Sequence, residues 1–584
     1  MFGNVISVFE YTVIVENLLK RVESSFLGVH VIFEDKHKIV GEITKITKEE
    51  IECVLVGEFE NGQFVNGITH KPSSQAKIRV VNKDEVVLLL GNQSIDSKED
   101  LYVGKSLIYD GFNVSANINN FFSNHFAIIG NSGSGKSCTV SRLFQNLFYR
   151  RNFIPVNAKI VLFDVYGEYH NAFETINRSA QCRYKTLTTD ITSTRSEIIK
   201  VPPYFLDVDD IALLLNVDSP AQIPIIEKAL RYVYLFTEEE EKVIAYKNNI
   251  IARAVMDILT SGKEPARLRD QIMAVLSTFH TKDINLESEI IQPGYTRTLR
   301  QCINLDQTGK MNAIQLVTEF IEYFIDEELE LNSSMKPKKY TLKDLYNAFE
   351  FALISEGILK SDKVYDINNI LKVRLESVLN SENMRYFDVP DYISKEDYIK
   401  RLFTSEDGKQ VQLLNFNLNY VDERFAKLLT KLFSKMLFDY ALTLDKKENF
   451  NVQILLEEAH RYVQNDRDTD VLGYNIFDRI TKEGRKYGVI LGMITQRPSE
   501  LSTTALSQCS NYIVLRMFHP DDLTIIKSIT HSISENDIEK LKSLGPGNSL
   551  CFGTAFNIPC FAKIDPPNPY PNSSNAQIGA SWFK

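Results

Sequence analysis

The segment GNSGSGKS, Gly130–Ser137, constrains the fold of this 584-residue chain more than any other feature. It matches the pattern G-x-x-x-x-G-K-[ST] in full, follows the apolar run of residues 126–129 and opens an amphipathic stretch. The glycines of such a loop let backbone N–H groups converge on phosphate oxygens, and the following helix adds the positive end of its dipole. The sequence therefore predicts a strand, a phosphate-binding loop and a helix within a βαβ unit of a parallel sheet.

The same loop predicts the ligand class. Lys136 is placed for the β- and γ-phosphates of a nucleotide, and Ser137 offers its hydroxyl to Mg²⁺. We therefore expect ATP and Mg²⁺ as cofactors, with Ser137 and Glu457 on the metal side. The residues expected to contact the nucleotide are Gly130, Asn131, Ser132, Gly133, Ser134, Gly135, Lys136, Ser137 and Cys138.

Two adjacent glutamates end the apolar run in NVQILLEEAHRYV, residues 451–463. Adjacent like charges repel and burial strengthens the repulsion, so the pair needs positive charge nearby, which Mg²⁺ and Lys136 would supply. We expect Glu457 to be the metal-side acid and Glu458 to orient and deprotonate the attacking water. The alternative is a pair of solvated glutamates that open a helix and are favoured by its dipole.

Polar residues also follow two other predicted buried strands. Gln496 follows VILGMIT and is expected to sense the γ-phosphate or hold the water, although a capping cluster would give the same pattern. Asp164 ends the strand in KIVLFDV and is expected at the phosphate edge together with Glu168, with a structural turn as the alternative.

A basic pair, Arg485 and Lys486, precedes the strand that ends at Gln496. An arginine near the sheet edge can complete the ATP site of a neighbouring subunit as an arginine finger. We expect Arg485 to do so, and the alternative is a solvated base at a helix end.

Hydrophobic periodicity predicts an α/β chain whose parallel sheet is interrupted by a helical block. Alternating strands and turns at the start indicate a small β-barrel, most simply a structural or oligomerisation module. Four buried strands resume after residue 410, in VQLLNFNL, VQILLEE, VILGMITQ and YIVLRMF. The predicted parts are a barrel at 1–100, the first part of the core at 101–204, a helical insertion at 205–402, the second part of the core at 403–564 and an arm at 565–584.

Composition restricts the partners and the compartment. The net charge of −10 argues against a uniformly basic nucleic-acid coat protein but allows a local basic channel. The seven scattered cysteines form no Cys-x-x-Cys pair, which favours a reduced protein without structural zinc. No signal peptide and no run of 18 apolar residues is apparent. We expect a cytoplasmic protein with no membrane partner.

Six segments together resemble the HerA family, in the HerA/FtsK group of ring ATPases. They are HFAIIGNSGSGKS, VLFDVYGEY, ILLEEAHRYV, EGRKYGVILGMITQRPSELS, LSQCSNYIVLRM and LGPGNSLCFG. Their order and spacing fit the family layout of an N-terminal β-barrel, a RecA-like P-loop ATPase core with a helical segment, and a C-terminal arm. The resemblance is weakest in residues 205–402 and after 564.

The resemblance implies a homo-hexameric ring that hydrolyses ATP and moves double-stranded DNA through its channel. It assigns Glu458 as the catalytic glutamate, Glu457 as the metal-side acid, Gln496 as the sensor and Arg485 as the trans-acting arginine. Family members often carry an arginine just before the histidine that precedes the first core strand, where this chain has Asn124 before His125. Another base must act here, or hydrolysis is slower.

The family occurs in two settings, and each implies a partner. One is DNA-end resection with a NurA-type nuclease, and the other is bacterial anti-phage defence with an effector such as a nuclease or a sirtuin-type NAD hydrolase. The Lys, Asn and Ile-rich composition favours the defence setting. A rival from another class is an ATP-regulated ring scaffold that assembles the effector with little translocation. A small-molecule kinase leaves the barrel and the EGRKYG…TQRPSEL block unexplained.

Overall fold

The computed structural model describes residues 2–238, 240–329, 339–355, 362–444, 450–464, 467–529, 533–573 and 578–582. The chain divides into two compact units. The first contains Met1–Ile198, Glu396–Asp466 and Tyr474–Lys584, and the second contains Ile199–Lys395 and Arg467–Gly473. In the part of the chain that the structure describes, no helix is long and apolar enough to cross a membrane.

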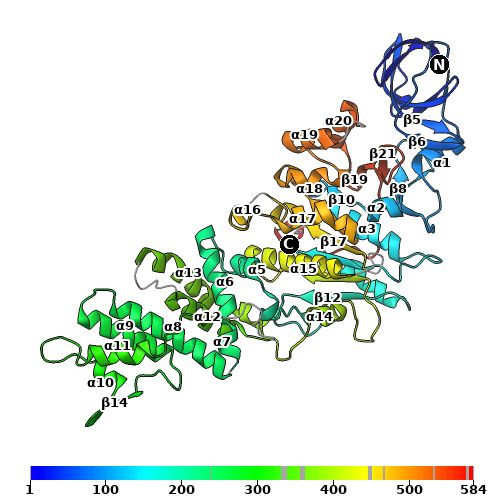
Figure 1. Ribbon diagram of the computed structural model, residues 1–584. Helices are drawn as coiled ribbons and strands as arrows, with labels where there is room; N and C mark the ends of the chain where they lie inside the picture. The colour runs from blue at the N-terminus through cyan, green and yellow to red at the C-terminus, as the bar shows by residue number, and fades with distance from the viewer. Residues whose placement is uncertain are drawn as a thin grey trace. The chain divides into compact units, whose positions relative to one another are not determined.

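The first unit begins with a curved antiparallel sheet, at the blue end of Figure 1. Its strand order is β1-β2-β5-β4-β3-β7, and β6 pairs with β5. The long strand β5 alternates buried and partly exposed residues, as expected for a sheet with one face on a core. The strands are β1 (Phe2–Phe9), β2 (Thr12–Asn17), β3 (His30–Glu34), β4 (Lys38–Ile46), β5 (Glu50–Glu60), β6 (Gln63–Asn66) and β7 (Lys77–Val80).

One segment that the sequence assigns to strands is partly helical. The stretch AKIRVVNKDEVVLLLG forms β7 and then the helix α1 (Lys83–Leu90). Asn82 starts this helix because its side chain accepts the backbone N–H of Glu85, and the Glu85 carboxylate accepts the N–H of Asn82. This capping box outweighs the β propensity of the valines that follow.

The core of the first unit is a twelve-stranded sheet of order β13-β12-β16-β11-β17-β18-β10-β19-β20-β21-β8-β9. From β13 to β19 all pairs are parallel, which confirms the predicted sheet and its four late strands. The cyan and yellow-to-orange segments of Figure 1, far apart in sequence, build it together. The parallel strands are β10 (His125–Ile129), β11 (Ile160–Asp164), β12 (Tyr184–Thr188), β13 (Glu197–Ile198), β16 (Leu413–Asn417), β17 (Val452–Glu457), β18 (Val489–Thr495) and β19 (Cys509–Leu515).

Four antiparallel strands extend this sheet beyond β19, and the sequence did not predict them as part of it. The hairpin of β8 and β9 precedes the phosphate-binding loop in the chain but lies at the far edge of the sheet. The extending strands are β20 (Asn548–Gly553), β21 (Cys560–Lys563), β8 (Asp100–Ser106) and β9 (Asn113–Asn117).

Helices cover the core sheet through apolar stripes. In α3 (Lys136–Phe148) the buried residues Val140, Leu143, Phe144 and Leu147 recur at helical spacing. The longer α15 (Glu423–Thr443) is capped by the Asp422 side chain, which accepts the N–H of Phe425. The other α-helices of this unit are α2 (Ile118–Phe122), α4 (His170–Phe173), α17 (Ile476–Glu483), α18 (Thr503–Ser507), α19 (Pro520–Ile529), α20 (Glu535–Ser543) and α21 (Ile578–Trp582), and α14 (Lys395–Leu402) begins at the boundary.

The second unit is mainly helical, as predicted, and is packed around aromatic rings. Phe351 is 1% exposed, and its ring centroid lies 5.1 Å from that of Phe279 and 5.7 Å from that of Phe236. The parts of two predicted helices that fall on 330–331 and 356–359 lie outside the described residues. The elements are α5 (Val208–Leu214), α6 (Ile223–Tyr232), α7 (Tyr234–Thr237), α8 (Glu241–Leu259), α9 (Pro265–Thr278), β14 (Glu289–Gln292), β15 (Tyr295–Thr298), α10 (Leu299–Ile303), α11 (Ile314–Glu322), α12 (Leu342–Ser355), α13 (Asp362–Leu379) and α16 (Arg467–Leu472).

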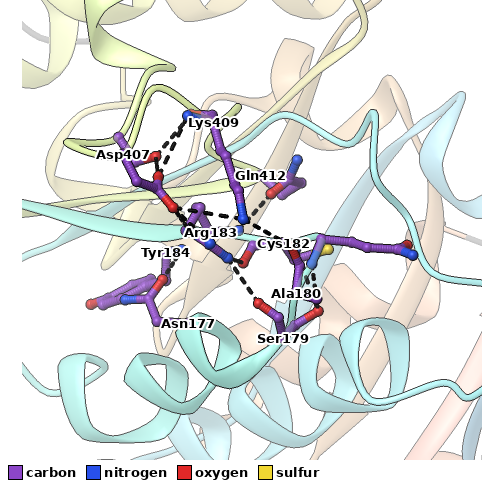
Figure 2. A network of polar contacts seen from close by, with 11 residues as sticks. Asn177, Ser179, Ala180, Cys182, Arg183, Tyr184, Asp407, Lys409 and Gln412 are labelled. Atoms are coloured by element: carbon purple, nitrogen blue, oxygen red, sulfur yellow. Dashed lines mark hydrogen bonds and ion pairs between the residues drawn. The ribbon is translucent and has the colours of Figure 1, made fainter.

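A polar network fixes the place where the chain re-enters the core sheet at β16 (Figure 2). The Arg183 guanidinium donates two hydrogen bonds to Asp407 Oδ2, at 2.9 and 2.7 Å. The buried Gln412 side chain accepts the backbone N–H of Arg183 at 2.6 Å and donates to the Val156 carbonyl at 2.6 Å. Lys409 donates to the Ala180 carbonyl at 3.2 Å. These contacts hold β16 in register with β12 and β11, although about two hundred residues separate β16 from those two strands in sequence.

Replacing Gln412 by Ala is expected to destabilise the first unit by about 2 kcal/mol, because the N–H of Arg183 and the carbonyl of Val156 each lose the buried Gln412 partner. Calorimetric unfolding of the full chain would measure the change. Lys409→Ala is the matched control: Lys409 is exposed and should cost about 0.5 kcal/mol or less. Equal losses in the two variants would contradict this role for Gln412.

Candidate active site

The loop after β10 is fixed between the two strands that flank β10. The N–H of Gly130 donates to the Thr495 carbonyl at 3.2 Å, and the N–H of Asn131 donates to the Arg516 carbonyl at 3.0 Å. Gly133 and Gly135 have φ of +73° and +98°, a left-handed region that glycine occupies at little cost. The loop therefore turns tightly into α3 and leaves its backbone facing the carboxyl ends of the strands.

A cavity of about 430 Å³ lies at this edge. It lies beside the phosphate-binding loop, and residues at or just after the ends of β11, β17 and β18 line it. Its lining residues are Ser132, Gly133, Gly135, Lys136, Ser137, Cys138, Tyr166, Glu168, Glu457, Glu458, Ile494, Gln496 and Ser573. Most of the expected site residues thus share one cavity, whereas Asp164 and Arg485 are not among its lining.

Lys136 is the cation that faces the acids of this cavity. Burial lowers the pKa of the Lys136 ammonium, and the carboxylates of Glu458, Glu457 and Glu168 act in the opposite direction. Its Nζ donates to the carbonyl of Asn131 at 3.3 Å. A partly buried ammonium held at the amino end of a helix is suited to bind phosphate oxygens.

Glu457 and Asp164 form a buried acidic pair. Burial raises the pKa of Glu457 well above its usual range, and the carboxyl of Asp164 adds to the effect. Burial also raises the pKa of Asp164. Two buried carboxyl groups in contact disfavour double ionisation, and a cation nearby would favour it.

The contacts of Asp164 match the turn alternative. Its carboxyl accepts the backbone N–H groups of Glu168 and Tyr169, at 3.0 and 3.1 Å, and the amide of Asn415 at 3.2 Å. Its side chain is therefore occupied in holding the turn after β11 and in contacting Glu457. Glu168, which the turn presents, lines the cavity instead.

Glu458 adopts a left-handed backbone conformation, with φ of 49° and ψ of 47°. Such a conformation costs a residue with a side chain roughly 1–3 kcal/mol and is found where surrounding structure imposes it, often at active sites. β17 ends at Glu457, and the turn at Glu458 brings both carboxyl groups to the same cavity. Two neighbours on a regular strand would point to opposite faces.

The Glu458 carboxyl retains one oxygen without a hydrogen bond among the described residues. This atom, Oε2, is buried and lies 3.4 Å from Nδ1 of His460. Burial lowers the pKa of His460, which keeps the ring neutral near pH 7, and its Nδ1 lies 3.1 Å from the Thr495 hydroxyl. Oε2 thus lies beside His460 and away from solvent, whereas the carboxyl group as a whole lines the cavity, where it can accept a proton from a bound water.

The strand that carries Gln496 lies between the loop strand and the acid strand. β18 pairs with β10 on one side and with β17 on the other. The P-loop strand and the Glu457 strand are therefore not adjacent, and Gln496 enters the wall of the cavity from between them.

Arg485 and Asn124 lie at the opposite edge of the sheet. Arg485 precedes β18, and its charge acts on His125, the first residue of β10, whose pKa is lowered to about 4 mainly by burial. β10 has five residues, so this edge is about 16 Å from the loop at roughly 3.3 Å per residue. Asn124 is buried and donates to the Asn120 carbonyl. The structure therefore does not bring Arg485 to the cavity of its own chain.

The C-terminal segment also reaches the cavity, where Ser573 is a lining residue. No local sequence pattern predicts this contact. Asp565 accepts the Tyr102 hydroxyl at 2.8 Å, the N–H of Asn568 donates to Gln145 on α3 at 2.8 Å, and the N–H of Asn572 donates to the Glu168 carbonyl at 2.8 Å. Residues 565–573 thus lie on their own chain rather than as a free tail or on a neighbour. Tyr166 is the other lining residue without a sequence signal.

The residues present fit a nucleotide and its metal ion. The left-handed glycines leave the loop free of side chains where phosphates would lie, and Lys136 supplies positive charge. The Glu457 and Glu458 carboxyl groups and the Ser137 hydroxyl line the same cavity and are oxygen donors of the kind that Mg²⁺ takes. The arrangement can bind a phosphate chain and activate a water beside it.

Comparison with known proteins agrees with this geometry. The family described as "Helicase HerA, central domain" matches residues 101–328. A Pyrococcus furiosus protein named "DNA double-strand break repair helicase HerA" is 21% identical over 553 residues, which cover 94% of this chain and 82% of the relative. A protein of the same name from Sulfolobus acidocaldarius is 23% identical, with coverage of 91% and 80%.

Among solved structures, VirB4 of Thermoanaerobacter pseudethanolicus matches with a TM-score of 0.45 and 13% identity, over 81% of this chain and 98% of that one. The regions matched by these two relatives extend along almost the whole chain, so they span its phosphate-binding loop and its acid strand. The chain is therefore similar to the HerA family along most of its length, and residues 101–328 match that family's central domain.

Proposed function

We propose that this protein is a homo-hexameric ring motor that hydrolyses ATP to move along double-stranded DNA. The observation that carries the proposal is the placement of Glu458, whose left-handed backbone turns its carboxyl group into the cavity that Lys136 also lines. The names of the curated relatives describe a helicase in double-strand break repair, which supports DNA as the substrate of the motion.

Within the cavity, the chain's own residues divide the work. Lys136 and the loop Gly130–Ser137, with Cys138, hold the phosphates, while Ser137 and Glu457 are the metal-side groups. Mg²⁺ when bound supplies charge that stabilises the phosphates and lets Glu457 ionise. Glu458 accepts the proton of the attacking water, and Gln496 orients that water from the neighbouring strand. Asp164 acts as a positioning residue, because it contacts Glu457 and the turn that presents Glu168.

A ring explains the distant edge at which Arg485 lies. Because one strand length separates Arg485 from its own cavity, it can reach only the cavity of another subunit. In that position its guanidinium would stabilise the charge that develops on the transferred phosphate. It would also supply the positive charge that family members often carry as an arginine at the position of Asn124.

The remaining parts follow the family layout. We propose that residues 1–100 close into a small β-barrel, that 101–204 and 403–564 form the RecA-like core, that 205–402 are an insertion and that 565–584 are an arm. The effector partner would be a nuclease or a sirtuin-type NAD hydrolase in anti-phage defence. The alternatives are end resection with a NurA-type nuclease and an ATP-regulated scaffold for the effector.

The ATPase rate with and without duplex DNA tests the motor directly. We expect duplex DNA to raise the rate several-fold at low salt and the increase to decline as salt rises, because phosphate contacts release counterions. A basal ATPase that duplex DNA leaves unchanged at low salt would contradict translocation and favour the scaffold. Lys136→Ala is the control for hydrolysis by contaminating enzymes.

Glu458→Gln and Lys136→Ala should separate hydrolysis from binding. Glu458→Gln removes the proton acceptor and should lower kcat by about 10²–10⁴-fold while nucleotide still binds. Lys136→Ala removes a phosphate ligand and should weaken nucleotide binding itself. Fluorescent-nucleotide titration and steady-state rates measure the two effects, and equally poor binding by both variants would refute these roles.

Mixed rings should reveal a trans-acting Arg485. Subunits with Arg485→Ala and subunits with Glu458→Gln are each expected to be inactive alone. Mixed together, they form some interfaces with an intact Glu458 on one side and an intact Arg485 on the other, so ATPase activity should return. Lys486→Ala, the adjacent base, should remain active alone, and mixtures that stay inactive would remove the arginine from the mechanism.

A further inference from the structure

Three metal-binding side chains meet in the N-terminal sheet, far from the nucleotide cavity in the chain. His37 lies in the turn between β3 and β4, Glu58 lies on β5, and His70 lies in the segment that follows β6. One donor atom from each residue lies within 4.8 Å of the donor atoms of the other two. Three separate segments of the sheet thus contribute one side chain each.

Glu58 is a buried carboxylate whose contacts hold it ionised. It is 3% exposed, and its Oε1 accepts the backbone N–H groups of Thr69 and His70, at 2.5 and 2.6 Å. Burial acts to raise the pKa of Glu58, but the hydrogen bonds from His70 and Thr69 outweigh it and hold the pKa below its usual value. The sheet therefore keeps a negative charge in its interior, next to two imidazoles.

The two histidine rings are placed together by this carboxylate and by stacking. Nδ1 of His70 lies 2.8 Å from Oε2 of Glu58, which fixes the orientation of the ring. The His37 ring stacks on the His70 ring with centroids 3.5 Å apart and an interplanar angle of 8°. The lone pair of each ring nitrogen lies in its ring plane, so the stacked rings must turn away from parallel before both can face one ion, and the exposed turn leaves His37 free to rotate.

We propose that His37, Glu58 and His70 bind a divalent transition metal ion, with Zn²⁺ as the best match. Two imidazoles and a carboxylate form a donor set that zinc accepts, whereas Mg²⁺ and Ca²⁺ prefer oxygen donors alone. Zinc bonds of about 2.0–2.2 Å place donor atoms roughly 3.3 Å apart. Closing the site from separations of up to 4.8 Å therefore requires a movement of about 1.5 Å and a rotation of the His37 ring out of the stack.

Binding needs no net loss of a proton from a neutral imidazole. The metal ion takes the place of the proton on Nδ1 of His70, and the ring carries its proton on Nε2 instead, so Glu58 exchanges a hydrogen bond for a metal bond. The fourth position of a tetrahedral ion stays open for a water or for a ligand from another molecule. The bound ion would cross-link the β3–β4 turn, β5 and the segment before β7. This differs from the expectation of no structural zinc, which rested on the cysteines alone.

Zinc and cobalt titrations of the full chain, stripped with chelator and without nucleotide, test the site. The wild-type chain should bind one more equivalent of Zn²⁺ than His37→Ala or His70→Gln, measured by calorimetry. Co²⁺ should give a visible absorption band that both variants lose. Glu58→Gln keeps an oxygen for the two N–H groups and should weaken binding by about 10–100-fold.

His519→Ala is the matched control, since His519 is exposed and lies 3.9 Å from the Asp521 carboxylate but has no second histidine in that pair. It should bind zinc as the wild type does. His37 is in an exposed turn, so His37→Ala should unfold at the wild-type temperature in chelator and below it with zinc present. Zinc stoichiometry, cobalt band and zinc-dependent unfolding unchanged in His37→Ala would overturn the proposal.

Discussion

The nucleotide cavity depends on the balance between one ammonium group and a cluster of carboxyl groups at the ends of two parallel strands. Lys136 interacts with the charges of Glu168, Glu457 and Glu458, and the carboxyl of Asp164 helps to raise the pKa of Glu457. Without positive charge beyond Lys136, burial disfavours ionisation of all four acids together. A site arranged in this way is incomplete until a cation arrives, so binding of a metal nucleotide changes both its charge and its protonation.

That balance requires strict positions for the strand ends, and the core sheet supplies them. The order places β18 between β10 and β17, so the loop, the sensor strand and the acid strand open onto one edge. The chain leaves this sheet after β13 and returns at β16, and the Arg183–Asp407 and Gln412 contacts secure its return. A long insertion is tolerated because loop closure costs little extra entropy as length grows.

Much of this arrangement follows from sequence, and the failures have physical causes. The P-loop, the buried strands and the cavity positions of Glu457, Glu458 and Gln496 could be predicted because each pattern reflects local geometry at a strand end. Part of the β7–α1 stretch was misassigned because one capping box reversed a β-rich composition. The placement of residues 565–573 could not be predicted, since their hydrogen bonds join Pro- and Asn-rich chain to residues hundreds of positions away.

In the proposed ring, the two edges of the core sheet would carry different halves of a catalytic site. The carboxyl edge holds the phosphate loop and the acids, and the amino edge holds Arg485 beside His125. A rigid sheet keeps these edges a fixed distance apart, so an arginine on one subunit and a phosphate on the next can meet only when two copies dock in one register. Hydrolysis would then occur only when neighbouring subunits are docked. The charge change in the cavity between two subunits would then move one subunit against the next. That coupling would be a consequence of sheet geometry rather than of a separate signalling element.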